Sequence, residues 1–238
     1  VMPLAAREYG EKRADRTEPP TLRLAFVGDI YLGSWAEAYL DTHGVSYPFS
    51  ECIELFNTMD LVVGNLEGPL VRTGEKFLEK EYVLHSPPSI ARALYDANIR
   101  AVTLANNHIL DFGPAALDST MEVLTRQKIF YFGIGKDRTE ANHALSITIR
   151  DQSISLLGYS ATFPEEFWAT DSTAGTAFPY EEDVIAAIEK EVHAGRAVIT
   201  IMHWGAEKRE TPKDYQVELA YLCIDHGASA VIGHHPHV

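Results

Sequence analysis

Apolar residues along this chain gather in short continuous runs that alternate with stretches of helical periodicity. Runs of this length, bounded by glycine, asparagine or histidine, predict strands that are covered on both faces. They occupy residues 24–27, 61–63, 101–104, 197–202 and 230–232. Between them, apolar residues at three- and four-residue spacing predict helices near residues 89–98, 114–124, 184–195 and 216–227.

Two stretches depart from this alternation of strand and helix. Residues 145–159 alternate apolar and polar side chains around a short polar turn, which predicts a hairpin and hence a sheet system that is not purely parallel. Residues 161–180 are rich in Ser, Thr, Pro, Gly and aromatic residues without a period and are expected to form a loop. The fold class is therefore α/β, with residues 1–21 as a flexible lead-in and residues 22–238 as one domain.

Composition narrows the classes of function. The hydrophobic share of 46% and the charged share of 23% are typical of a globular protein. With 20 Lys and Arg against 34 Asp and Glu, the net charge of −14 argues against nucleic-acid binding. No run of 18 apolar residues predicts a transmembrane helix, and no signal peptide is visible. Cys52 and Cys223 stand far apart, which excludes a disulfide framework and a thiolate zinc site.

Side chains capable of metal binding or acid–base chemistry follow all five predicted strands. In open α/β sheets, the carboxyl ends of the strands form the edge where ligands bind. The five sets are Gly28-Asp29, Gly64-Asn65-Leu66-Glu67, Asn106-Asn107-His108 with Asp111, His203-Trp204-Gly205 with Glu207, and Gly233-His234-His235-Pro236-His237. Such a coincidence at five strand ends indicates a shared site.

The residue types in these sets point to divalent-metal chemistry. Oxygen and imidazole donors without thiolate suit Mn, Fe, Zn or Mg, as one ion or two. A bound cation would also supply the positive charge that this acidic chain lacks, so an anionic substrate becomes acceptable.

Together the five motifs resemble the CapA family of capsule biosynthesis proteins, which are associated with poly-γ-glutamate and related to calcineurin-like metallophosphoesterases. The resemblance spans nearly the whole chain, from Leu22 to Val238. It implies a metallophosphoesterase-like fold of two facing mixed β-sheets flanked by helices, with a metal centre at the strand ends. Family members usually continue with further strands, so the resemblance also implies that the domain extends past Val238.

The resemblance assigns roles by position. Asp29, Asn107, His203, His235 and His237 match metal ligands. The remaining matched residue, His108, corresponds to the histidine that protonates the leaving group, and Asp111 is expected to orient it or to cap the following helix.

Two positions depart from the phosphoesterase pattern. Tyr31 stands where a histidine is usual, and Asn65 stands where an aspartate usually bridges the metals. A neutral amide bridges two cations poorly, so Glu67 is expected to supply the carboxylate. Residues beside the ligands are expected to contact the substrate, and these are Asn65, Asn106, Trp204 and Glu207.

Three functions remain open from the sequence. The first is a metal-dependent hydrolase of phosphoesterase type acting on a phosphate-containing substrate. The second is a capsule-assembly factor that binds an anionic polyglutamate chain without turnover, and the third is hydrolysis of the γ-amide bond. The resemblance further implies capsule-synthesis partners and a place in the bacterial cell envelope.

Overall fold

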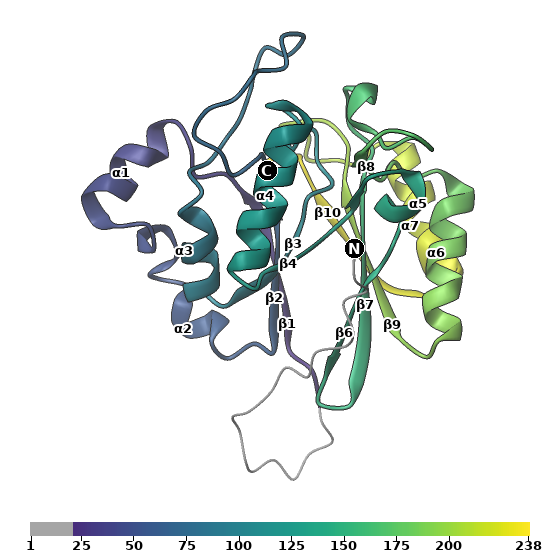
Figure 1. Ribbon diagram of the computed structural model, residues 1–238. Helices are drawn as coiled ribbons and strands as arrows, with labels where there is room; N and C mark the ends of the chain where they lie inside the picture. The colour runs from purple at the N-terminus through teal and green to yellow at the C-terminus, as the bar shows by residue number, and fades with distance from the viewer. Residues whose placement is uncertain (1–20) are drawn as a thin grey trace.

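Two four-stranded sheets face each other in the computed structural model, which describes residues 21–238 (Figure 1). The first sheet has the order β1-β2-β3-β4, and its strands all run parallel. Its members are β1 Leu24–Ile30, β2 Leu61–Leu66, β3 Ile99–Thr103 and β4 Phe130–Phe132. The second sheet has the order β10-β9-β7-β6, parallel except for the β6–β7 hairpin. Its members are β6 Leu145–Ile149, β7 Gln152–Ser160, β9 Ala197–His203 and β10 Ala228–His234.

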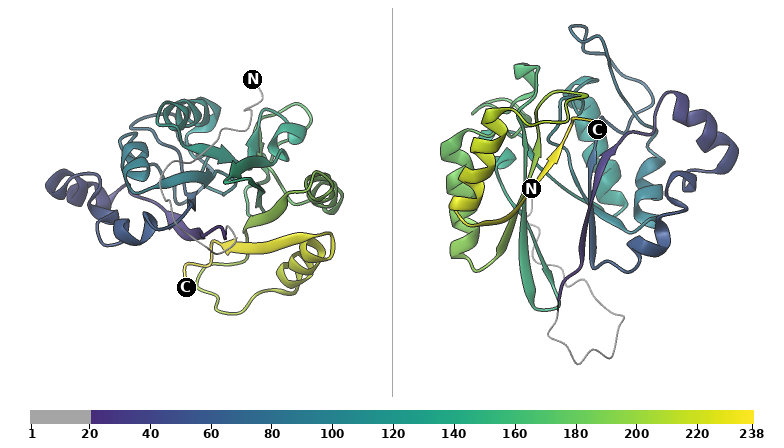
Figure 2. Two further views of the ribbon diagram at one scale, coloured as in Figure 1. Left: turned by 90° about the horizontal axis from the view of Figure 1, so that it is seen from below. Right: turned by 180° about the vertical axis from the view of Figure 1, so that it is seen from behind.

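Helices cover the outer face of each sheet, as the views in Figures 1 and 2 show. On the side of the first sheet lie α1 Trp35–His43, α2 Ile53–Phe56, α3 Ile90–Asp96 and α4 Gly113–Arg126. On the side of the second sheet lie α5 Arg138–Ala141, α6 Glu181–His193 and α7 Asp214–Asp225. Smaller elements are the two-stranded sheet of β5 Ile134–Gly135 with β8 Gly175–Thr176, and the 3-10 turns η1 Tyr47–Phe49 and η2 Glu165–Phe167.

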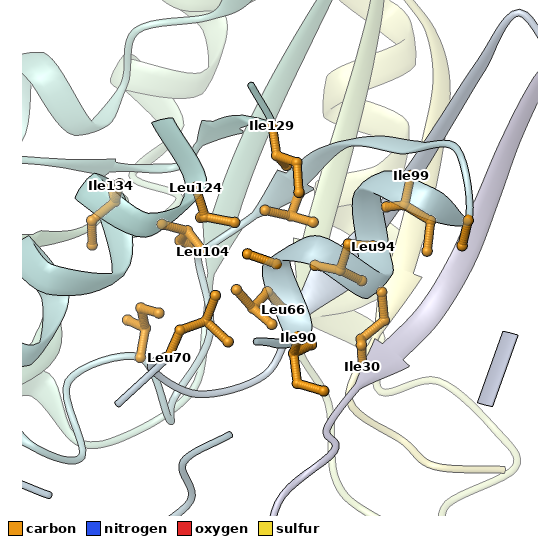
Figure 3. Packing of buried hydrophobic residues seen from close by; sticks show 14 of the residues in the cluster. Ile30, Leu66, Leu70, Ile90, Leu94, Ile99, Leu104, Leu124, Ile129 and Ile134 are labelled. Carbon is orange, nitrogen blue, oxygen red and sulfur yellow. The ribbon is translucent and has the colours of Figure 1, made fainter. Parts of the chain in front are cut away.

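Three large parts of the hydrophobic core follow these four layers, and a fourth, smaller cluster contains Val71, Phe112 and Ala116. One part packs the first sheet against its helices, where Leu66, Leu94 and Leu124 are fully buried (Figure 3). A second lies between the two sheets, and a third lies between the second sheet and α6 and α7. Because both faces of each sheet are covered, every residue of β2 is buried, as its continuous apolar run predicts.

The predicted architecture is confirmed, with corrections in detail. The five strands, the hairpin and the four helices are all present, but only the second sheet is mixed. The predicted loop at residues 161–180 contains η2 and β8, and the patterns of α1, α2 and β4 were too short or too polar to be recognised. Residues 1–20, most of the predicted lead-in, lie outside the described part. Within residues 21–238, the search for membrane-spanning helices finds none with the required length and apolar character.

The register of β1 shifts between Phe26 and Asp29, directly before the first of the polar strand ends. A bulge of this kind re-aims the side chains that follow it, and here it precedes Asp29. The neighbouring strand accommodates the shift through Gly64, because a Cβ there would lie 2.6 Å from Cδ1 of Ile30. The glycine therefore lets Ile30 pack tightly while the Asp29 carboxylate lies at the sheet edge.

The two sheets approach each other closely at Gly158 on β7. A Cβ at this position would lie 2.7 Å from Oγ1 of Thr103 and 3.0 Å from Cδ2 of Phe132. We therefore expect Gly158→Ala to destabilise the protein by about 1–3 kcal/mol, measured by urea unfolding. Gly28→Ala, where no atom lies within 4 Å of the added Cβ, is the matched control and should be nearly neutral. Equal stability of the two variants would show that the sheets are not held this closely.

Candidate metal centre

The carboxyl ends of β1, β2, β3, β9 and β10 meet on one side of the molecule, the upper side in Figure 1. Asp29 lies at the centre of the polar groups gathered there. Nδ2 of Asn65 donates to its Oδ1 at 2.8 Å, and the backbone N–H of His235 donates to its Oδ2 at 3.2 Å. Nδ1 of His234 lies 3.4 Å from Oδ1, and Nδ1 of His237 lies 3.2 Å from Oδ2. Asp29 therefore joins the ends of the two sheets.

Asn65 and Asn106, which were expected to contact the substrate, are both fully buried. Nδ2 of Asn106 donates to Oδ1 of Asn65 at 3.0 Å and to the carbonyl oxygen of Leu66 at 2.8 Å. Its Oδ1 accepts from the backbone N–H of His108 at 3.1 Å. The two amides therefore hold Asp29 and the turn that carries His108, and they do not reach the open cleft.

The six predicted metal ligands are brought together. Three overlapping groups of carboxylate and imidazole residues have ligand atoms within 4.8 Å of one another. These groups are Glu67 with His203 and His235, Asp29 with Glu67 and His237, and Glu207 with His235 and His237. The sixth predicted ligand, Asn107, adjoins them because its Oδ1 lies 2.9 Å from Nε2 of His203. The arrangement can hold a divalent cation with oxygen and nitrogen donors.

The last motif is held in an unusual backbone conformation. His235 has a φ of 92° and His237 a φ of 53°, which only glycine and a few polar residues adopt readily. Such positions cost on the order of 1–3 kcal/mol each and persist where the surrounding structure enforces them. Nδ1 of His235 is buried and has no hydrogen-bond partner. A buried imidazole nitrogen left unpaired beside carboxylates is suited to bind a metal ion.

The two central carboxylates have opposite pKa shifts. Burial opposes ionisation of Asp29, but the hydrogen bond with His234, the charge of His203 and the amide of Asn65 outweigh it and hold its pKa well below the usual value. Burial raises the pKa of Glu67 to about 8, and the negative charge of Asp29 adds to the effect. The imidazoles that face Glu67 lie 3.6 Å and 3.8 Å away, too far for hydrogen bonds. Glu67 is therefore the carboxylate whose charge lacks compensation.

His203 and His235 favour the neutral form that binds metals. Burial, followed by the neighbouring His235, lowers the pKa of His203 well below its usual value. Burial and the nearby His237 likewise lower the pKa of His235. Neutral imidazoles can offer a nitrogen lone pair to a cation without first losing a proton.

His108 and Asp111 lie beside these ligands and contact each other, with 2.6 Å between Nδ1 and Oδ2. Lys80 contacts both of these residues, and the sequence did not predict its place in the site. Its Nζ lies 2.9 Å from Nδ1 of His108 and 2.5 Å from Oδ1 of Asp111. Burial lowers the pKa of Lys80, while Asp111 opposes that shift. No motif marks this lysine, because it comes from a stretch that lacks regular periodicity.

The other two residues that were expected to contact the substrate, Trp204 and Glu207, differ in burial. Trp204 is buried in the core between the second sheet and its helices, so it supports the strand end and does not line the cleft. Glu207 is exposed and lines a cleft of about 660 Å³ together with Asp29, Glu67 and His108. The cleft is also lined by Asn107 and His237, whereas His203 and His235 are buried behind it, so part of the candidate ligand set is within reach of a substrate.

The raised pKa of Glu67 predicts how the metal-free protein responds to pH. The folded pKa of about 8 exceeds the usual 4.5, so folding retains a proton on Glu67, and stability is lost as pH rises between these values. Glu67→Gln avoids this loss. In the presence of a chelator, we expect it to raise Tm by roughly 5–10 °C at pH 8.5, corresponding to about 2–4 kcal/mol.

At pH 4.5 the same variant should differ little from the wild type, because both side chains are then largely neutral. Glu210→Gln, which changes an exposed carboxylate, is the control. If the difference in Tm between Glu67→Gln and the wild type is the same at both pH values, the pKa of Glu67 is not raised by burial.

Comparisons with known proteins identify the family and the fold of this chain. The family model described as "Bacterial capsule synthesis protein PGA_cap" matches residues 23–238. The PGA biosynthesis protein CapA of Bacillus subtilis is 30% identical over 219 residues, which are 91% of this chain and 58% of that protein. The capsule biosynthesis protein CapA of Bacillus anthracis is 26% identical over 93% of this chain and 56% of that protein. The chain thus spans somewhat more than half the length of these relatives.

Among solved structures, the 5'-nucleotidase precursor of Thermus thermophilus superimposes with a TM-score of 0.51 at 14% identity. The match covers 84% of this chain and 39% of the nucleotidase, and it shows a metallophosphoesterase-like fold. Because the family model covers almost all of the residues, the chain belongs to the bacterial capsule synthesis protein family PGA_cap.

Proposed function

We propose that this chain carries a divalent-metal-dependent hydrolase site of phosphoesterase type and serves in the synthesis of a poly-γ-glutamate capsule. The convergence of Asp29, Glu67, His203, His235 and His237 on one volume is the observation that carries the hydrolase proposal. The similarity to a PGA biosynthesis protein of Bacillus subtilis and a capsule biosynthesis protein of Bacillus anthracis supports the biological setting. Mn, Fe, Zn or Mg, as one ion or two, suits this donor set.

The residues present fit a metal ion. Nδ1 of His235 is buried without a partner, and Glu67 is a buried carboxylate that lacks a hydrogen bond from the facing imidazoles. A cation would accept the lone pair of the His235 nitrogen and would compensate the negative charge of Glu67. When bound, the metal supplies Lewis-acid polarisation of a phosphoryl oxygen and positive charge for the anionic substrate.

The acid–base work falls to His108. Its Nδ1 faces Asp111 and Lys80 inside the protein, so Nε2 is the nitrogen left for the cleft. From there Nε2 gives a proton to the leaving oxygen as the ester bond breaks. Asp111 accepts from the backbone N–H of Leu84 and faces His108, which holds the ring in place.

A second function uses the same site without turnover. Asn65 stands where a bridging carboxylate is usual, and its amide is bonded to Asp29 at 2.8 Å. With fewer bridging anions, the centre would hold one ion and bind an anionic polyglutamate chain as a platform. Metal-dependent binding of poly-γ-glutamate, without hydrolysis of a phosphoester or of the γ-amide, favours this alternative.

Metal binding is expected to depend far more on Glu67 than on Asn65. Glu67→Gln is nearly isosteric and removes a charge from the centre, so we expect metal affinity to fall about 100-fold or more. Asn65→Ala removes no charge; it deletes the contacts of one amide with Asp29, His203 and Asn106 and should cost about tenfold. Isothermal titration with Mn²⁺ or Zn²⁺ measures both. His193→Ala, an exposed histidine on α6, is the control. Unchanged affinity in Glu67→Gln would remove Glu67 from the ligand set.

Hydrolysis is expected to depend on His108 according to the leaving group. His108→Ala should keep its metal yet lose about 100-fold or more in the hydrolysis of an alkyl phosphate, because an alkoxide needs a proton to leave. The loss with p-nitrophenyl phosphate should be much smaller, since that leaving group departs as a stable anion. An equal loss with both esters would contradict the acid role. A wild-type protein that binds metal but hydrolyses neither ester would contradict the hydrolase and favour the binding platform.

A further inference from the structure

We propose that Lys80 is a positioning residue of this site, which ties a projecting segment to the turn that carries Asn107 and His108. The inference deepens the proposed hydrolase and rests on it. Residues 71–85 form neither helix nor strand, and Figure 1 shows them as the loop that stands out above the first sheet. Lys80 is the residue of this segment that reaches back to the candidate metal centre.

The ammonium group of Lys80 contacts three residues of one short turn. Its Nζ donates to the carbonyl oxygen of Asn107, lies 2.9 Å from Nδ1 of His108 and donates to Oδ1 of Asp111 at 2.5 Å. The Lys80 side chain is 13% exposed and that of Asp111 is fully buried. A tetrahedral ammonium has three protons to give, and two acceptor oxygens and Nδ1 of His108 are arranged around this one.

These contacts determine which side of the His108 ring faces the cleft. Nδ1 meets Lys80, which can only donate, and Oδ2 of Asp111 at 2.6 Å, which accepts from a protonated nitrogen. Nδ1 therefore has a partner inside the protein whether or not it carries the proton. Either bond turns Nε2 toward the cleft, where the leaving oxygen is protonated under the proposed function.

Asp111 anchors the same segment at two further points. Its Oδ2 accepts from the backbone N–H of Leu84 at 2.7 Å, and its carbonyl oxygen accepts from the backbone N–H of Phe77 at 2.9 Å. The ring of Phe77 packs edge-on against Phe167, with 5.1 Å between centroids. Residues 77–84, several of which line the cleft, are thus held in place by the backbone and the side chain of one buried residue, Asp111. Lys80 joins this anchor to Asn107 and His108.

If Lys80 had only a structural role, that role would be to compensate the buried charge of Asp111. An arginine would perform that task, because it keeps the charge. It would not reproduce the other contacts, since its planar fork cannot direct single protons to the carbonyl of Asn107 and to Nδ1 of His108 at once. Lys80→Arg therefore separates positioning from charge compensation.

The experiment compares Lys80→Arg and Lys80→Met with the wild type, using Mn²⁺-loaded protein and an alkyl phosphate. For Lys80→Arg we expect a Tm and metal content close to the wild type and a KM within about threefold, but a kcat at least tenfold lower. Lys80→Met also leaves Asp111 uncompensated and should lose Tm as well as kcat. Lys76→Met, an exposed lysine of the same segment, is the control and should leave all four quantities unchanged.

Amide hydrogen exchange gives a readout that needs no activity. Both Lys80 variants should exchange faster in residues 77–84 and 106–111 together, with β6 and β7 unchanged. A wild-type kcat in Lys80→Arg would overturn the positioning role and leave Lys80 as a counter-charge. If the wild type hydrolyses nothing, the proposed function fails, and the exchange result alone decides whether Lys80 ties the segment to the turn. Unchanged exchange in both segments would overturn that tie.

Discussion

The partly buried carboxylate of Asp29 and the buried carboxylate of Glu67 face the same small volume, and the cost of ionising Glu67 there is the constraint on which the site depends. Three kinds of donor converge on Asp29, namely the amide of Asn65, the backbone N–H of His235 and the imidazoles of His234 and His237. Glu67 has no comparable support, and its pKa is raised to about 8 by burial and by Asp29. A bound cation would remove this imbalance, which is why we propose that the donor set forms a metal centre.

The fold supplies the rigidity that such a site requires. Parallel strands bring their carboxyl ends to one edge, and helices on both outer faces bury the sheets so that the strand ends are fixed. The strained backbone of His235 and His237 costs a few kcal/mol in total, and it is held because β10 pairs with β9 directly before it. The core thus offsets the strained backbone of the last motif and the buried carboxylate of Glu67, which oppose folding.

The sequence predicted the fold, and it predicted that most residues of the candidate site lie together, for one physical reason. Apolar runs that end in Asp29, Asn107 or His203 mark strands whose ends must share an edge, so their side chains could be expected to meet. Side-chain direction was harder to predict. The spacing of Asn65, Asn106 and Trp204 does not reveal that the two amides bond inward and that the indole packs into the core. The local pattern of apolar and polar residues indicates which side chains are buried, but it says little about which polar group a side chain bonds to.

Lys80 is a residue of the candidate site that could not be predicted from the sequence. It lies 27 residues from Asn107 along the chain, in a segment without apolar periodicity, and its contacts exist only because tertiary structure folds that segment back over the cleft. A lysine in such a stretch is ordinarily exposed, and nothing in the residues around it signals a buried ion pair with Asp111. Only the folded geometry identifies it.

X-ray absorption spectroscopy of the protein loaded with Mn²⁺ or Zn²⁺ tests the central claim most directly, because it reports the atoms bound to the ion. The account predicts nitrogen and oxygen ligands without sulfur, with the outer-shell scattering of imidazole rings, and it predicts that this imidazole contribution decreases in His235→Ala. A spectrum with oxygen ligands alone, or one that is unchanged in His235→Ala, would show that the convergent strand ends do not form the metal centre.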